Sequence, residues 1–416
     1  PPPPPPPPPP PFFFLQKTAH PLLRRLVGSE MCIRDRCETG CSHFFGLHFL
    51  RRIHVFAGGL VTKPRRLSTL TVIGKPQIFS KVAPLGQAQP PTKNERYEIL
   101  MRTRELLAKR TDEFANLIRL EAGLCMRETR YEVGRAQEVF KFAAAEALRD
   151  DESIFSCDAA KNGPARKIFT LREPLSLVAA ITPFNQPLNQ VAHKLAPAIA
   201  AGVPVLLKPS SKPPLTAIRL TELLYEAGLP PAMLSTFVGD RKAITEALVC
   251  DPRVDLVTFT GGTGPGKHLT TIAGYKKLCL ELGGNAPLIV LRDADLDLAA
   301  TLATEGSFRN SGQRCTAVKR ILVEESVLDE FTARFLAKAG EFTVGDPADE
   351  ATRIGTVIDE PAAIELEERV NKAVAAGAEV AGAVVVAGAV VAGAELDEPG
   401  AAADGAGPSA AASSAP

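Results

Sequence analysis

Apolar residues in the middle of this chain recur with two different spacings. Between residues 95 and 122 they stand three or four positions apart, which predicts one amphipathic helix or a broken pair of helices. The stretch RYEVGRAQEVFKFAAAEAL, residues 130–148, has the same spacing and predicts another helix. From residue 175 onward, short continuous apolar runs appear, and helical segments separate them.

The second pattern predicts alternating strands and helices. The predicted strands are residues 175–183, 203–210, 234–240 and 254–262, and the helices between them are residues 188–202, 215–228 and 241–250. A further pair of strands, residues 276–284 and 286–291, precedes a helix that begins near Asp295. Such alternation implies crossover connections and an α/β fold with a parallel sheet covered on both faces. We therefore expect a ligand site at the carboxyl ends of these strands.

The two ends of the chain differ in composition from its middle. Residues 1–94 begin with a run of prolines and contain no acidic residue from position 39 onward, so we assign them to no domain and interpret them as a transit peptide or an artefact. Residues 382–416 consist largely of Ala, Gly and Val. Such a segment has too few large side chains to offset the entropy lost on ordering, which predicts a disordered tail.

Composition argues against several classes of function. The 48 basic residues are balanced by 47 acidic ones, so no net field would attract nucleic acid. No apolar run is long enough for a membrane span. The eight cysteines are scattered without metal-ligand spacing, so we expect reduced thiols, no metal site and a cytoplasmic or mitochondrial protein. A small-molecule ligand is the remaining expectation.

Four short motifs carry candidate chemistry, and each has an ordinary structural explanation as well. The GGTGPG turn, Gly261 to Gly266, can approach a phosphate, but glycine-rich turns are also common for packing reasons. Cys315 in GQRC is either a nucleophile or a small buried thiol. Glu281 in LELGG is either structurally paired or a general base. Asn185 in TPFNQP either caps a helix or stabilises an oxyanion.

Taken in order, these motifs resemble those of NAD(P)-dependent aldehyde dehydrogenases. TPFNQP, LKPSS, FTGGTGPG, LELGG and GQRC follow one another as they do in that family, and the resemblance extends from about Glu95 to about Ala373. It implies a Rossmann-type parallel-sheet domain that binds NAD(P) in residues 95–280 and an α/β catalytic domain in residues 281–381. Family members continue further, so we expect this catalytic domain to be incomplete and the segment that assembles the family's homo-oligomers to be missing.

The resemblance implies a role for each catalytic candidate. Cys315 would attack an aldehyde to form a thiohemiacetal, and Asn185 would hold its oxyanion. After hydride transfer, Glu281 would activate the water that hydrolyses the resulting thioester to a carboxylate.

The implied cofactor is NADP or NAD. The residues assigned to it by the resemblance are Thr182, Pro183, Lys208, Ser211, Gly261 and Gly266. Lys208 would contact the adenosine ribose, and Ser210 and Ser211 stand where many NAD-using members carry a glutamate, two or three residues after that lysine, that repels a 2′-phosphate. With Lys212 beside it, Ser211 predicts use of both cofactors and a preference for NADP.

Two arginines point to the substrate. Arg314 precedes the nucleophile and Arg135 lies in YEVGRAQEVF, and either one could instead form a surface ion pair. The phrases around them look like those of members that oxidise phosphonoacetaldehyde, where guanidinium groups bind the anionic tail. Gln186, however, stands where those members carry His. The alternatives are oxidation of a phosphorylated aldehyde or a semialdehyde, and an inert remnant that binds a dinucleotide without turnover.

Overall fold

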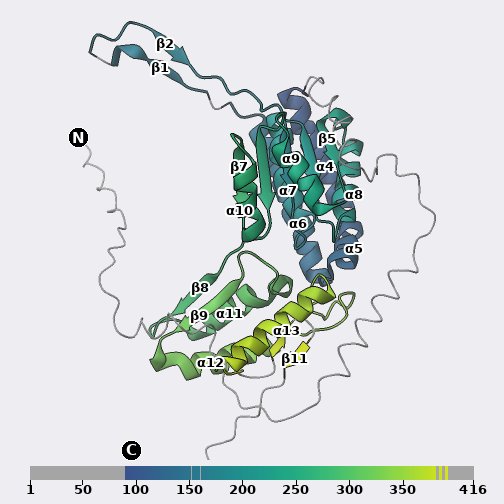
Figure 1. Cartoon of the computed structure of the whole chain (residues 1–416), viewed down its shortest axis with the longest axis vertical. Coiled ribbons are helices and arrows are strands. Elements are labelled where there is room, and N and C mark those ends of the chain that lie inside the picture. The colour runs from purple at the N-terminus through teal and green to yellow at the C-terminus, as the bar shows by residue number, and fades with distance from the viewer. Residues whose placement is uncertain (1–89, 151, 160, 381–383, 387–388, 392–416) are drawn as a thin grey trace, which may run out of the picture.

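The described part of the chain begins a few residues before helix α4 (Lys93–Lys109). The computed structural model describes residues 90–150, 152–159, 161–380, 384–386 and 389–391 (Figure 1). Apart from its last five residues, the segment 1–94 lies outside them. Helix α4 begins at a capping box in which the Thr92 hydroxyl accepts from the Glu95 amide and the Glu95 carboxylate accepts from the Thr92 amide.

Three helices at this end confirm the helical pattern of residues 95–148. After α4 come α5 (Thr111–Ala122) and α6 (Met126–Ala147). The pattern of residues 95–122 is therefore a broken pair, which is interrupted at Arg110. Gly123 ends α5 in the left-handed conformation, with a φ of 70°, which glycine adopts at least cost.

A five-stranded parallel sheet follows and confirms the predicted alternation. Its strands are β3 (Val178–Ile181), β4 (Val205–Lys208), β5 (Leu234–Thr236), β6 (Leu256–Thr260) and β7 (Lys277–Glu281). The connecting helices are α7 (Asn189–Ala201), α8 (Leu215–Glu226), α9 (Arg241–Cys250) and α10 (Thr263–Ile272), with the short 3-10 helix η2 (Pro231–Met233) before β5. The spatial order is β5-β4-β3-β6-β7, so the strand order reverses between β3 and β6. Ligand crevices of open α/β sheets lie at such a switch point.

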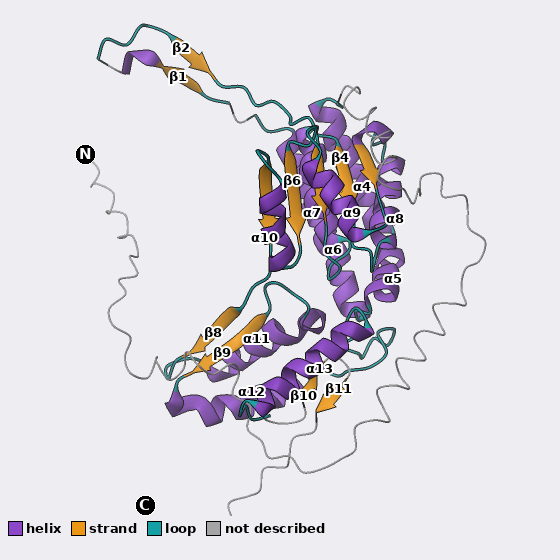
Figure 2. Cartoon of the chain, in the orientation of Figure 1, coloured by secondary structure: helices purple, strands orange, loops and turns teal. Residues whose placement is uncertain are grey.

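Alternate residues of each strand enter cores on opposite faces of the sheet. Val178 and Ala180 belong to the core formed with α4 to α8, whereas Ala179 and Ile181 belong to the core formed with α9 and α10. Helices therefore cover both faces (Figure 2). Burial on both faces explains why these strands read as continuous apolar runs rather than as alternating ones.

A second, smaller sheet stands apart from the first. Its strands are β8 (Ala286–Val290) and β9 (Val318–Val323), which pair in parallel, and its helices are α11 (Leu296–Phe308), α12 (Leu328–Gly340) and α13 (Glu360–Ala375), with the 3-10 helix η4 (Glu325–Val327) before α12. The two strands that we predicted as a pair, β7 and β8, thus belong to different sheets. The chain leaves the first sheet after β7 and enters the lower body in Figure 1.

A hairpin that sequence patterning missed extends away from the first sheet. Its antiparallel strands are β1 (Ile154–Ser156) and β2 (Lys167–Phe169), with a 3-10 turn, η1 (Cys157–Ala159), after β1. Apolar side chains on it are exposed, including Phe155 at 54% and Phe169 at 65%. Three-residue strands without a buried face leave too short a pattern to detect.

The chain also forms two short strands where we predicted disorder. These are β10 (Val384–Val386) and β11 (Ala389–Val391), which pair antiparallel. The runs of valine favour extended backbone, because β-branched side chains suit strands. The rest of the predicted tail lies outside the described residues.

Candidate active site

The carboxyl ends of neighbouring strands bring four predicted site residues to one edge of the first sheet. Thr182 follows β3, Lys208 ends β4, Gly261 follows β6 and Glu281 ends β7. The Thr182 amide donates to the Lys208 carbonyl at 3.2 Å, and the Gly261 amide donates to the Glu281 carbonyl at 3.0 Å. Because these bonds continue the strand ladders, the four residues form one row at the switch point.

Polar groups at this edge lack protein partners. The hydroxyls of Thr182 and Thr260 are buried and make no hydrogen bond to any described residue. Lys208 is 3% exposed, and its Nζ donates to the adjacent Pro209 carbonyl at 3.2 Å. Burial, followed by the positive charge of Arg241, lowers the pKa of Lys208. A ligand rich in hydroxyls and phosphates would supply the missing partners, so these residues fit NAD(P).

Packing explains part of the glycine-rich turn. Gly266 lies inside α10, where a Cβ would overlap the Leu282 side chain. Its amide donates to the Gly262 carbonyl at 3.0 Å, and the Gly261 amide is occupied by a carbonyl as well. Any phosphate contact by Gly261 or Gly266 therefore depends on close backbone approach, while the first turn of α10, from Thr263, has amides without helical partners.

The residues before Cys315 form a turn with unusual backbone geometry. It comprises η3 (Arg309–Gly312), in which Asn310 has a φ of 59°, Ser311 of 53° and Gly312 of 69°. Left-handed conformation costs a non-glycine residue about 1–3 kcal/mol, so two such residues need support from their surroundings.

Asn185 fastens this turn to the end of β3. Its Nδ2 donates to the Gln313 carbonyl at 2.6 Å, and its carbonyl accepts from Asn310 Nδ2 at 3.0 Å. Gln313 Oε1 in turn accepts from the Ile358 amide at 3.0 Å. Helix α7 begins at Asn189, so Asn185 does not cap it. Its Nδ2 carries a second hydrogen, which is the donor that an oxyanion needs.

The loop after β7 passes directly against the predicted nucleophile. A Cβ on Gly284 would lie 2.6 Å from the Cys315 carbonyl oxygen, so a larger residue would displace the cysteine. Lys319 Nζ donates to the carbonyls of Gly284, Arg314 and Cys315 at 2.9, 3.0 and 3.2 Å. Cys315 itself is exposed, which is inconsistent with a buried core thiol. The turn that bears Cys315, the Asn185 side chain and the loop that follows Glu281 thus meet at one place.

Arg314 is engaged by the protein rather than directed to a substrate. Its Nη2 donates to the carbonyls of Glu305 and Gly306, at 3.0 and 2.9 Å, near the end of α11. Burial lowers its pKa, and its Nε is buried without a partner in the described part of the chain. The guanidinium satisfies carbonyls at a helix end, which supports a structural role for Arg314.

Arg135 is the more accessible of the two arginines. It lies on α6 and lines a hollow of about 420 Å³ between α6 and α7, together with His193. Burial lowers the pKa of His193, and the positive charges of Arg135 and Lys194 lower it further. The negative charge of Glu281 acts in the opposite direction.

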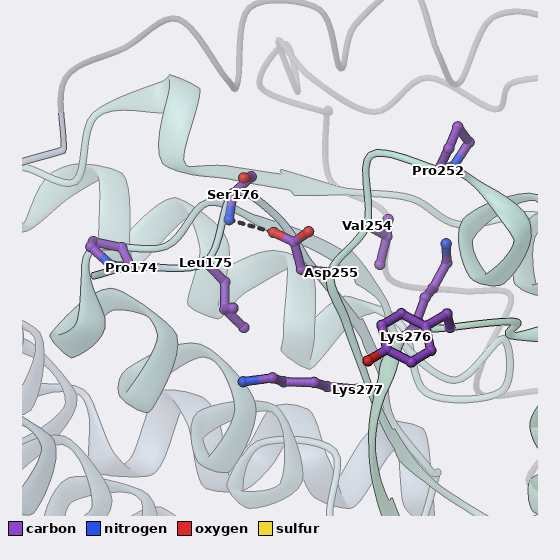
Figure 3. Close-up of a pocket in the computed structure, with 9 residues that line it drawn as sticks. Pro174, Leu175, Ser176, Pro252, Val254, Asp255, Lys276 and Lys277 are labelled. Carbon is purple, nitrogen blue, oxygen red and sulfur yellow. Dashed lines mark hydrogen bonds between the residues drawn. The ribbon is translucent and has the colours of Figure 1, made fainter. Parts of the chain in front are cut away.

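A larger hollow lies at the opposite end of the strands. It measures about 680 Å³ and is lined by residues at or just before the starts of β3, β6 and β7, among them Ser176, Asp255 and Lys277 (Figure 3). The Ser176 amide donates to Asp255 Oδ2 at 2.5 Å. None of the predicted site residues lines this hollow, so size alone does not locate the site.

Membrane spans and metal clusters are both absent from the described residues. No helix within the described ranges is long and apolar enough to cross a bilayer. In the same residues, no three His, Cys, Asp or Glu side chains are grouped so that they could hold a metal ion.

Sequence reasoning missed Glu132, which holds helix α7. Its Oε1 accepts from the amides of Leu188 and Asn189 at 2.8 and 2.9 Å. It is 2% exposed, and burial raises its pKa to about 8 despite these hydrogen bonds. A carboxylate on the apolar face of α6, one turn before Ala136, was the available signal.

Lys194, on α7, is a second missed group. It is 7% exposed, and its Nζ donates to the Thr258 hydroxyl at 3.0 Å. Burial lowers its pKa to about 8, while the charge of Glu281 acts in the opposite direction.

Arg309 was missed as well, although it lies in the turn before the cysteine. Its Nε and Nη2 bind the two Glu128 oxygens at 2.9 and 3.1 Å, and its guanidinium stacks 4.5 Å from the Tyr131 ring centre. This two-point ion pair joins the turn to α6.

Comparison with known proteins identifies the family. The sequence profile described as the aldehyde dehydrogenase family matches residues 86–391. The chain belongs to the aldehyde dehydrogenase family. It is 42% identical over 286 residues to a 3-sulfolactaldehyde dehydrogenase of Priestia aryabhattai and 39% identical over 290 residues to a lactaldehyde dehydrogenase of Methanocaldococcus jannaschii. These matches cover 69% of this chain but 60% and 61% of the relatives.

Solved aldehyde dehydrogenase structures share this fold. A glyceraldehyde-3-phosphate dehydrogenase of Methanocaldococcus jannaschii complexed with NADP superposes with a TM-score of 0.70 at 34% identity, covering 74% of this chain and 68% of its own. An NAD-dependent aldehyde dehydrogenase of Sinorhizobium meliloti superposes with a TM-score of 0.69 at 33% sequence identity. That match covers 73% of this chain and 61% of the other. The expected aldehyde dehydrogenase fold is thereby confirmed, and both cofactors occur among the relatives.

Proposed function

We propose that this chain carries the nucleophile and the cofactor edge of an NAD(P)-dependent aldehyde dehydrogenase that oxidises an anionic aldehyde to its carboxylate. The observation that carries the proposal is the junction at Cys315. There, Asn185 binds the preceding turn and Gly284 packs on the cysteine carbonyl.

The cofactor edge is assigned to the row of strand ends. Lys208, whose buried Nζ bonds only the adjacent Pro209 carbonyl, and Thr182, whose buried hydroxyl has no partner among the described residues, would bind the adenosine side. Pro183, Ser211, Gly261 and Gly266 complete the assigned set. Bound NAD(P) would supply the acceptor for the hydride that leaves the aldehyde carbon.

The side chains perform the remaining steps. The Cys315 thiolate adds to the aldehyde carbon, and the second hydrogen of Asn185 Nδ2 stabilises the oxyanion of the thiohemiacetal. Loss of hydride leaves a thioester on Cys315. Glu281 then accepts a proton from water, whose oxygen attacks the thioester and releases the carboxylate and the thiol.

Arg135 is the preferred residue for the anionic tail of the substrate. It is exposed in the hollow beside His193, whereas the Arg314 guanidinium is occupied by helix carbonyls. The substrate named for the 3-sulfolactaldehyde relative carries a sulfonate, which resembles the phosphonate that we expected, and a guanidinium suits either anion. The lactaldehyde named for other relatives has no charged tail and provides the natural comparison.

The test is a substrate series on the full chain. The kcat/KM values of phosphonoacetaldehyde, 3-sulfolactaldehyde, glyceraldehyde-3-phosphate and succinic semialdehyde are compared with that of lactaldehyde, with Cys315→Ser as the inactive control. Arg135→Leu should raise KM for the anionic aldehydes about tenfold or more and leave lactaldehyde unaffected. If Arg314→Leu alone has this selective effect, the roles of the two arginines are exchanged.

The alternative function, dinucleotide binding without turnover, makes a different prediction. Calorimetry would then show NADP or NAD binding to the chain, while no aldehyde in the series yields a reduced cofactor. Formation of NADPH or NADH with any of these aldehydes, lost in Cys315→Ser, excludes that alternative.

A further inference from the structure

Lys212, which we expected to favour NADP, is held by an ion pair. Its Nζ lies 2.5 Å from Asp359 Oδ2 and 5.6 Å from the centre of the Phe184 ring. Phe184 follows β3 at the cofactor edge, and Asp359 is the N-cap residue of α13. The lysine therefore bridges the cofactor edge and the second half of the chain, and its charge is already balanced by a carboxylate.

The two carboxylate oxygens of Asp359 contact different groups. Oδ1 accepts from the Ala362 amide at 3.1 Å and caps α13, whereas Oδ2 binds Lys212. Asparagine is as good an N-cap as aspartate but carries no charge. Exchanging Asp359 for Asn therefore removes the ion pair and keeps the cap.

The exposure of the pair leaves the lysine open to a competing phosphate. The side chains of Lys212 and Asp359 are 47% and 30% exposed, so the pair is open to solvent and to ligands. An exposed pair of this kind is weak, and a phosphate dianion is a stronger partner for an ammonium than one carboxylate. Ser211, one residue earlier, donates to the Gly239 carbonyl at 3.4 Å and adds no negative charge.

We propose that Asp359 is a specificity-determining residue for the cofactor, because it competes with the 2′-phosphate of NADP for Lys212. This inference rests on the proposed function, in which the adenosine ribose lies beside Lys208 and Ser211. Asp359 weakens NADP binding and leaves NAD binding unchanged, so it shifts the protein from NADP preference toward dual use.

The experiment measures binding of two nucleotides that differ by the 2′-phosphate. Dissociation constants of 2′,5′-ADP and 5′-AMP are determined by calorimetry for the full-length wild type, Asp359→Asn and Asp359→Asn/Lys212→Gln. We expect Asp359→Asn to bind 2′,5′-ADP about tenfold more tightly with 5′-AMP unchanged, and Lys212→Gln to abolish that gain. Asp359→Glu, which keeps the charge, should retain the wild-type ratio.

Several results would overturn the inference. One is an equal change for both nucleotides in Asp359→Asn, and another is a gain that survives Lys212→Gln. A third result concerns Arg241, the other cation near Lys208. The inference fails if adding Arg241→Gln to Asp359→Asn, rather than adding Lys212→Gln, abolishes the tighter binding of 2′,5′-ADP. If the wild type binds 5′-AMP but any of these three results is found, the role of Asp359 is refuted and the proposed cofactor edge stands. If it binds neither nucleotide, the proposed cofactor edge fails too.

Discussion

Replacing Glu132 by Gln is expected to make the protein more stable at alkaline pH. In the wild type this carboxyl is 2% exposed and accepts two amides at the start of α7. Burial is the main cause that raises its pKa to about 8 from an ordinary 4.5, and the neighbouring Glu128 adds to the shift. Glutamine keeps an oxygen for the two amides and removes the ionisable group.

The size of the effect follows from the two pKa values. Between pH 4.5 and about pH 8 the folded protein keeps a proton on Glu132 that the unfolded chain has released. The folded state binds more protons in this interval, so the free energy of unfolding falls as pH rises. At about 1.4 kcal/mol per pH unit, the full fall attributable to Glu132 is up to about 5 kcal/mol. Below pH 4.5 both states are protonated and the full contribution of this group is present.

Urea unfolding followed by circular dichroism at pH 5.5, 7 and 8.5 measures this difference. Subtracting the wild type from Glu132→Gln cancels the other titrating groups, and the gain in unfolding free energy should grow steadily with pH. Glu146→Gln, an exposed carboxylate on the same helix, is the control and should show no growing gain. Parallel pH profiles for the wild type and Glu132→Gln would refute the reasoning.

Three further predictions concern the nucleophile and the turn that precedes it. Asn185→Ala should lower kcat by about 100-fold with a small change in KM, measured by steady-state kinetics, because the oxyanion loses a donor; an unchanged kcat would contradict this. Gly284→Ala places a methyl group 2.6 Å from the Cys315 carbonyl, so iodoacetamide should label Cys315 at a clearly altered rate while circular dichroism stays constant. Arg309→Leu leaves the 8%-exposed Glu128 unpaired and should cost about 3 kcal/mol in urea unfolding, which adding Glu128→Gln largely restores. A double variant no more stable than the single one would argue against that pairing.

The order of strands and helices was predictable because burial of each element follows its own periodicity. The strand residues around Ala179 and Ala180 are buried on both faces, so their apolar run was visible without knowledge of the partners. The hairpin at Phe155 and Phe169 was not predictable, since its exposed side chains leave no burial pattern. Local sequence patterns also could not predict that β7 pairs with β6 and β8 with β9, because strand pairing depends on residues that are far apart in the sequence.

For the proposed site, motif order selected the candidate residues but not the groups that contact them. The positions of Asn185 and Cys315 were predicted, and the structure joins their segments through Gln313. The sequence left the surroundings of Arg314 open, and the structure places its guanidinium against carbonyls near the end of α11.

The sequence by itself thus determined the α/β class and nominated the sheet edge and the cysteine for the proposed site, because these depend on local periodicity and on motifs within a few residues. Tertiary structure alone decided that burial raises the pKa of Glu132, that Lys212 is paired with Asp359 and that Arg135 is the more exposed arginine. A charge on a long side chain acquires its pKa and its partner from groups that folding brings close, and those groups are far away in the sequence.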